Sequence, residues 1–137
     1  MDTYKINIEG LDRELRKFPV NDKLDIAAFI MFGDIEMTEV AARELLKRVP
    51  EHDVVVTAEA KNEQKLYLGE DDVNLLNGKR VLLVDDVIST GESLHALETL
   101  VEKTGANIVG RASVLAEGDA KDRDDIIFLS ELPLFFK

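Results

Sequence analysis

The chain has 137 residues, of which 45% are hydrophobic, and this size and composition predict one globular domain with a single core. Its formal net charge of -11 disfavours nucleic acid as a partner, and the lack of cysteine excludes disulfides and thiolate metal sites. No signal-peptide pattern opens the sequence and no apolar run is long enough to cross a bilayer, so we expect a cytoplasmic protein without a membrane partner.

The first part of the chain is predicted to hold a strand, a turn and an apolar segment. Thr3–Glu9 alternates between apolar and polar side chains, which is typical of a half-buried strand. Leu11–Lys17 is polar and predicts a turn with a short strand or helical piece, and Phe18-Pro19 begins an extended segment. Asp25–Phe32 is apolar and forms either core or the wall of a ligand pocket.

The next part is predicted to hold a helix and two strands. Met37–Val49 has apolar residues near helical spacing, and Pro50 ends it. Asp53–Ala58 is a buried strand, and Gln64–Leu68 is a short one. The link Glu59–Glu63 is too short for a parallel crossover, so these two strands, if paired, form an antiparallel hairpin.

The second half alternates between helices and strands, which predicts an open, mostly parallel α/β sheet with flanking helices and a ligand at the carboxyl edge of the strands. The expected elements are a short helix or turn over Glu70–Leu76, a buried strand over Val81–Val84, a helix over Glu92–Thr104, a strand over Ile108–Leu115, a charged loop over Glu117–Asp125, a short strand over Ile126–Leu129 and an apolar tail over Leu132–Phe136.

The stretch VLLVDDVISTGES, Val81–Ser93, carries the chemistry of this sequence. Two carboxylates, Asp85 and Asp86, follow a buried strand, and a polar turn containing Gly91 leads into a helix. Backbone N–H groups at a helix N-terminus suit a phosphate, and paired carboxylates suit sugar hydroxyls or magnesium held through water. The alternative is a strand end whose acids merely cap a helix, with Thr90 as an ordinary N-cap.

This stretch resembles the signature by which type I phosphoribosyltransferases bind 5-phosphoribosyl-1-pyrophosphate (PRPP). The resemblance extends to VVVTAEAK (Val54–Lys61) and to Gln64–Phe136, which contains AEGDAKDRDDIIFL and LPLF and is similar to the adenine branch of that family. It implies one phosphoribosyltransferase-like domain over residues 1–137. Residues 1–34 would be a hood-like segment and residues 35–137 the α/β core.

The resemblance also implies a function, the transfer of phosphoribosyl from PRPP to a purine base with release of pyrophosphate and with Mg²⁺ as cofactor. Asp85 and Asp86 would bind the ribose hydroxyls and magnesium, and no residue is assigned as catalytic. The 5′-phosphate would lie against Ser89, Thr90, Gly91, Glu92 and Ser93, and the pyrophosphate against Glu59, Ala60 and Lys61. The partners would be PRPP and a purine base or nucleotide, and the family often dimerises, so a homodimer is also considered.

The sequence departs from the family between Lys61 and Gln64. There the family has a helix, a parallel strand and a long mobile catalytic loop, and here Asn62-Glu63 stands in that place. Either a natural or engineered deletion leaves a minimal sheet, or a segment is missing from the sequence. In a minimal sheet the strand order becomes a flavodoxin-like 2-1-3-4-5 with one antiparallel strand. Turnover would then be impaired, and the alternative function is a non-catalytic scaffold that binds PRPP or a nucleotide phosphate.

Overall fold

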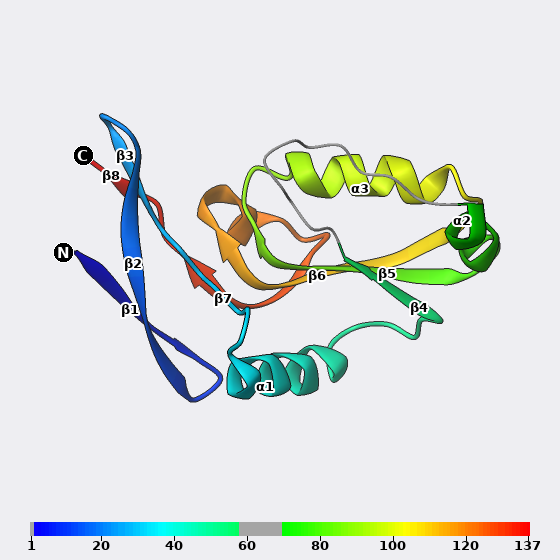
Figure 1. The fold of residues 1–137 in the computed structure, drawn as a ribbon, viewed down its shortest axis with the longest axis horizontal. Helices are drawn as coiled ribbons and strands as arrows, with labels where there is room; N and C mark the ends of the chain where they lie inside the picture. Colours follow the sequence, from blue (N-terminus) through cyan, green and yellow to red (C-terminus); the bar gives the residue numbers. More distant parts are fainter. Residues whose placement is uncertain (1, 58–69) are drawn as a thin grey trace.

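The computed structural model describes residues 2–57 and 70–137, and these residues form two sheets and flanking helices (Figure 1). The N-terminal sheet is antiparallel, with the order β1-β2-β3-β8, and the parallel sheet has the order β4-β5-β6-β7. The strands of the N-terminal sheet are β1 (Thr3–Ile8), β2 (Leu11–Asn21), β3 (Leu24–Ala27) and β8 (Phe135–Phe136). Those of the parallel sheet are β4 (Val54–Thr57), β5 (Arg80–Ile88), β6 (Asn107–Glu117) and β7 (Ile127–Leu132).

A β-hairpin opens the chain where the sequence predicted a turn over Leu11–Lys17. Glu9 and Gly10 both have positive φ, 50° and 92°, which makes the tight two-residue turn that suits a hairpin. The turn pairs Ile8 with Leu11, and from there β2 runs on as one long strand. The predicted turn within Leu11–Lys17 was wrong, because the turn lies at Glu9 and Gly10, whereas the short strand that the prediction allowed there is the first part of β2. The strand is long because this segment pairs with β1.

The apolar segment Asp25–Phe32 divides between core and surface. It begins in β3, where Ala27 is buried, and Phe29 is buried just beyond the strand. Phe32, in contrast, is 98% exposed. Met31 lines the cavity described below, so this segment supplies both core and pocket wall.

Helix α1 (Ile35–Leu46) confirms the helix that was predicted from residue 37 onward. Asp34 caps it by accepting a hydrogen bond from the Met37 N–H at 3.1 Å. Arg13 of β2 donates two hydrogen bonds to the same carboxylate, from Nε at 2.8 Å and from Nη2 at 3.0 Å. These bonds fix the start of α1 to the N-terminal sheet.

The parallel sheet is covered on both faces (Figure 1). One core cluster joins α1 and the N-terminal sheet to one face, and a second joins α2 (Glu70–Leu76) and α3 (Glu92–Glu102) to the other. This arrangement explains the near-continuous apolar runs of β5 and β6, because parallel strands are buried on both sides. It confirms the predicted α/β class with a mostly parallel sheet and flanking helices.

Three sequence expectations concern segments that follow strands of the parallel sheet along the chain. The segment Gln64–Leu68 lies outside the described residues, so its antiparallel pairing and the 2-1-3-4-5 order stay predictions. The charged segment Glu117–Asp125 is not a simple loop, because Gly118–Asp122 forms the 3-10 helix η1 and Glu117 is still part of β6. The expected apolar tail ends in β8, which pairs with β3.

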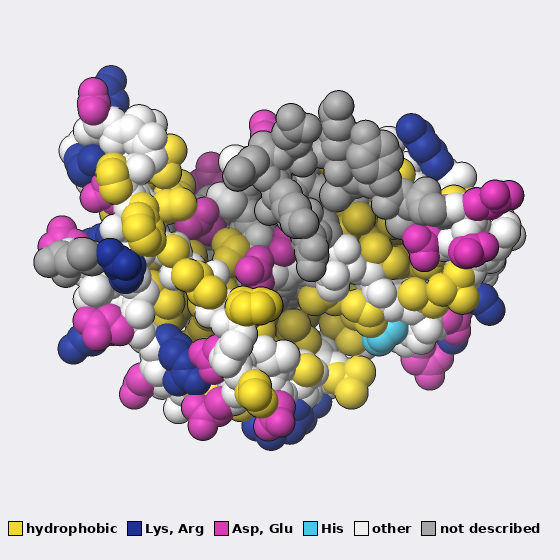
Figure 2. All heavy atoms as spheres, viewed as in Figure 1, with side chains coloured by type: hydrophobic (Ala, Val, Ile, Leu, Met, Phe, Trp, Pro, Cys, Tyr) yellow, Lys and Arg dark blue, Asp and Glu magenta, His cyan; other side chains and the backbone are white. Residues whose placement is uncertain are grey.

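Charged and hydrophobic side chains are distributed unevenly over the surface. On the face shown in Figure 2, hydrophobic side chains gather between the N-terminal sheet and α1, and acidic and basic side chains surround them. None of the helices in the described residues combines the length and apolarity needed to cross a membrane.

Candidate functional site

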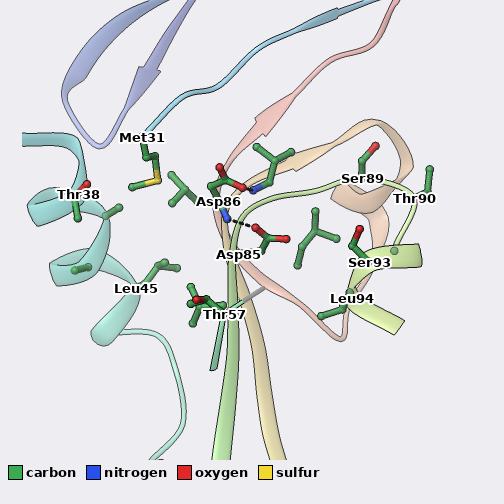
Figure 3. Close-up of a pocket in the computed structure, with 17 residues that line it drawn as sticks. Met31, Thr38, Leu45, Thr57, Asp85, Asp86, Ser89, Thr90, Ser93 and Leu94 are labelled. Carbon is green, nitrogen blue, oxygen red and sulfur yellow. Dashed lines mark hydrogen bonds between the residues drawn. The ribbon is translucent and has the colours of Figure 1, made fainter. Parts of the chain in front are cut away.

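A cavity of about 770 Å³ opens at the carboxyl ends of the parallel strands, between α1 and the turn that leads into α3 (Figure 3). Its floor is the end of β5, which contributes every residue from Val84 to Ile88. The remaining described lining residues are Met31, Thr38, Ala41, Ala42, Leu45, Thr57, Ser89, Thr90, Gly91, Ser93, Leu94 and Val114. The cavity thus has an apolar wall on the α1 side and hydroxyl groups on the α3 side.

Asp85 and Asp86 lie within β5, which continues past them to Ile88. The Asp86 N–H donates to Asp85 Oδ1 at 2.8 Å, and the Val87 N–H donates to Asp86 Oδ1 at 2.8 Å. Each carboxylate therefore has one oxygen fixed by the backbone. Burial, and after it the neighbouring Asp86 side chain, together raise the pKa of Asp85 to about 7.

The turn before α3 leaves the N-terminus of that helix without a side-chain cap. Gly91 is the N-cap residue, has φ 86° and makes no cap hydrogen bond, whereas Asp34 caps α1. The first helical bond runs from the His95 N–H to the Gly91 carbonyl at 2.8 Å. Thr90 is therefore not the ordinary N-cap of the alternative interpretation, although its Oγ1 accepts a hydrogen bond from the Glu92 N–H at 3.3 Å. Helix N-terminal amides of this kind suit an anion.

The structure brings together six of the residues that the sequence singled out. Two are acidic, three carry hydroxyls and one is glycine, and all line the cavity: Asp85, Asp86, Ser89, Thr90, Gly91 and Ser93. Glu92 is not among the described lining residues, and its side chain is exposed. The predicted pyrophosphate ligands Glu59, Ala60 and Lys61 lie outside the described residues.

Several cavity residues were not singled out from the sequence. Met31, Thr38 and Leu45 come from the segment before α1 and from α1 itself, and Thr57 ends β4 (Figure 3). Their place in the cavity depends on how α1 packs on the sheet, which no local pattern reveals. Met31 belongs to the apolar segment Asp25–Phe32, for which the sequence left a pocket wall as one of two interpretations. Thr57 also carried a usable signal, because a hydroxyl at the carboxyl end of a parallel strand follows the same edge rule as Asp85.

Comparison with known proteins places this geometry in a family. The sequence pattern of the phosphoribosyl transferase domain matches residues 27–133, which is more than half of the chain. The chain belongs to the phosphoribosyl transferase domain family. An adenine phosphoribosyltransferase of Corynebacterium jeikeium is 30% identical over 141 residues, which span 97% of this chain and 66% of that protein. A hypoxanthine/guanine phosphoribosyltransferase of Methanococcus voltae is 34% identical over 127 residues, or 89% and 64%.

A solved structure has the same fold as this phosphoribosyltransferase-like chain. The adenine phosphoribosyltransferase of Thermoanaerobacter pseudethanolicus superposes with a TM-score of 0.63 at 21% identity, covering 85% of this chain and 95% of that one. The chain spans just under two thirds of the length of the two curated relatives above. The relatives are named as adenine or as hypoxanthine/guanine phosphoribosyltransferases. These names support the resemblance to type I phosphoribosyltransferases that act on purines, and to their adenine branch.

A buried acid adjoins the turn before α3 and was not assigned a role from the sequence. Glu117, the last residue of β6, is only 8% exposed. Burial raises the pKa of its carboxyl group, and a hydrogen bond with the Ser89 side chain partly offsets that rise by lowering the pKa. Glu117 thus fixes the first hydroxyl of the turn. The sequence feature that could have identified Glu117 is its position as a single acid at the end of a long apolar strand.

The carboxylates of Asp85 and Asp86 line the cavity, and their chemistry fits a hydrated magnesium ion. No group of three or more potential metal ligands occurs among residues 2–57 and 70–137. Asp85 and Asp86 each have one oxygen fixed by a backbone N–H, which orients the carboxylate for a hard cation or its water shell. Mg²⁺ commonly keeps several waters and binds through one or two carboxylates together with substrate phosphates.

Proposed function

We propose that the cavity binds PRPP with Mg²⁺ in the manner of an adenine-type purine phosphoribosyltransferase, and that turnover is impaired because the Lys61–Gln64 stretch is shortened. The observation that carries the proposal is the uncapped α3 N-terminus at Gly91, which shares one cavity with Asp85 and Asp86. An anion socket and a carboxylate pair that line one cavity suit the phosphate end and the hydroxyl end of a ribose phosphate. The family match and the purine phosphoribosyltransferase names of the relatives support the same ligand.

In this proposal each part of the cavity binds one part of PRPP. Asp85 and Asp86 accept hydrogen bonds from the ribose hydroxyls and hold the hydrated metal. The 5′-phosphate lies at the turn, against backbone N–H groups and the hydroxyls of Thr90 and Ser93. Glu59, Ala60 and Lys61 are assigned to the pyrophosphate by family resemblance alone. Bound Mg²⁺ would neutralise charge on the pyrophosphate as it leaves.

The reaction forms a bond from a purine nitrogen to C1′ of the ribose and breaks the bond from C1′ to the pyrophosphate oxygen. Positive charge develops on the sugar as that bond weakens, and the nearby carboxylates stabilise it electrostatically. The chain contributes chiefly by positioning the two reactants, while the apolar wall at Met31 and Leu45 excludes water from one side.

The first test is PRPP binding by calorimetry with Mg²⁺. We expect Asp86→Asn to weaken binding about tenfold, because hydrogen bonds to a charged group are worth about 1.5–3 kcal/mol. Asp22→Asn removes the same charge from an exposed turn and should leave binding unchanged. Wild-type protein that fails to bind PRPP would refute the proposal, and equal affinity of the Asp86→Asn variant would remove that carboxylate from the site.

The second test concerns turnover, and it separates the enzyme from a binding scaffold. The shortened Lys61–Gln64 stretch lacks the residues that form the closing catalytic loop in the family pattern, so we expect pyrophosphate release near background with adenine, PRPP and magnesium. A rate of about 1 s⁻¹ or more, as in ordinary enzymes, would contradict this expectation. PRPP binding without turnover favours the second candidate function, a scaffold that holds PRPP or a nucleotide phosphate.

A further inference from the structure

The charges that line the cavity do not favour a phosphate. Among the described lining residues the charged side chains are Asp85 and Asp86, and both are acidic. The whole chain carries a net charge of -11, so its long-range field also repels a polyanion. A cation close to the turn would add charge-assisted hydrogen bonds to those from the backbone N–H groups and would offset this repulsion.

Arg123 is the cation that the fold brings to this turn. It follows η1, which Figure 1 shows in orange beside the green turn between β5 and α3. A Cβ atom added to Gly91 would lie 2.6 Å from Arg123 Nη1, so the guanidinium lies directly against the N-cap of α3. The two residues are far apart in sequence, and only the packing of η1 beside the turn joins them.

Asp125 holds the Arg123 guanidinium so that its Nη1 edge faces Gly91. Arg123 Nε and Nη2 donate to the two oxygens of Asp125 at 2.8 and 2.6 Å. The Arg123 N–H donates to the Ala120 carbonyl at 3.1 Å, which fixes the backbone to η1. A guanidinium has five N–H donors in a planar fork, so a pair with Asp125 along one edge leaves Nη1 on the Gly91 side.

The geometry points to Arg123 as a binding residue for the 5′-phosphate, with Asp125 as the residue that positions it. This inference rests on the proposed function, because it assigns a new residue to the phosphate end of that site. Arg123 supplies the positive charge that the cavity lining lacks, and Gly91 keeps the approach open because it has no Cβ. The segment around η1, which the sequence presents as a solvated charged loop, thereby becomes part of the ligand site.

The test compares Arg123→Gln with Lys121→Gln. Lys121 lies on the same short segment, is exposed and pairs with Asp122, so its substitution makes the same charge change away from the turn. We expect Arg123→Gln to weaken binding of both PRPP and ribose 5-phosphate about tenfold in calorimetry, since a charge-assisted phosphate contact is lost. Lys121→Gln should stay within about twofold of wild type, because exposed charges contribute little.

Two further measurements distinguish a phosphate contact from a structural role. Arg123→Lys keeps the charge and should retain most of the affinity, and the difference between wild type and Arg123→Gln should shrink at high salt because charge interactions are screened. Equal affinities of wild type and Arg123→Gln for ribose 5-phosphate would overturn the assignment of Arg123 while leaving PRPP binding intact. Wild-type protein that binds neither ligand would overturn the proposed function and this inference together.

Discussion

Replacing Asp85 with Asn should stabilise the ligand-free protein and weaken its binding of PRPP. The side chain is partly buried at the end of β5, and burial raises its pKa from 3.8 to about 7. At pH 8 the wild-type protein must therefore keep a charge where the surroundings disfavour it. Asn has the same shape and can still accept the Asp86 N–H, but it carries no charge.

The sign of the pH dependence follows from that raised pKa. Between pH 4 and pH 7 the folded protein holds the Asp85 proton more tightly than the unfolded chain does, so the contribution of Asp85 to the unfolding free energy falls as pH rises. Above pH 7 that loss is complete. One pKa unit corresponds to about 1.4 kcal/mol, but the Asp85 side chain is only partly buried and solvent screens much of the full shift. We therefore expect Asp85→Asn to gain on the order of 2 kcal/mol at pH 8, about half of the unscreened value, and little near pH 4.

Urea unfolding of wild type and Asp85→Asn at several pH values measures this difference directly. Subtracting the two curves removes the other acids, such as Asp53, whose pKa is lowered to about 2 by Arg80 and which titrates well below this range. PRPP binding at pH 8 should weaken at least tenfold, because a charged hydrogen-bond acceptor is lost. A variant that is no more stable than wild type at pH 8 would show that Asp85 is well solvated in the free protein.

Replacing Gly91 with Ala should have the largest effect on phosphate binding. The added Cβ points to Arg123 Nη1 at 2.6 Å, and φ 86° is a conformation that alanine disfavours. The end of a flexible arginine can move, so we expect the protein to fold with a loss of about 1 kcal/mol. The methyl group displaces the guanidinium and crowds the N-terminus of α3, and PRPP affinity should fall about 100-fold through loss of two or more charged contacts.

Gly78→Ala provides the matched control for this change. Gly78 has φ 74°, and a Cβ there meets nothing within 4 Å, so it carries the same backbone strain without touching the cavity. Both variants should lose similar stability in urea unfolding, while only Gly91→Ala should lose PRPP binding in calorimetry. If both variants bind PRPP as the wild type does, the ligand does not lie at the α3 N-terminus.

The parts of the site that were predictable from the sequence are those encoded locally. Within Val81–Ser93 the sequence predicted a strand from its apolar run, a site at the sheet edge from its two acids, and the start of a helix after the glycine-containing turn. The structure has these elements in that order. The same reasoning located α1 from its apolar spacing and from the breaker that follows it. For Glu70–Leu76 the sequence left a short helix or a turn open, and the structure has the helix α2 there.

The parts that were not predictable depend on contacts between distant segments. The tight turn at Glu9 and Gly10 uses a positive φ that glutamate rarely adopts, so Gly10 alone was a weak signal for the β1–β2 hairpin. Arg123 reaches Gly91 only because η1 folds beside the turn, and Met31 reaches the cavity only through the packing of α1. Composition made the η1 segment look solvated, although Glu117 at its start is buried.

The pairing of β8 with β3 also shapes how this chain folds. Phe135 and Phe136 join Asp25 and Leu24, and the Lys137 N–H donates to the Lys23 carbonyl at 2.8 Å. Closing a loop of this length is entropically costly, and contacts of high sequence separation slow folding. Helices and hairpins can therefore form early during synthesis, but the N-terminal sheet gains its outer strand only after the parallel sheet between the two segments has been translated.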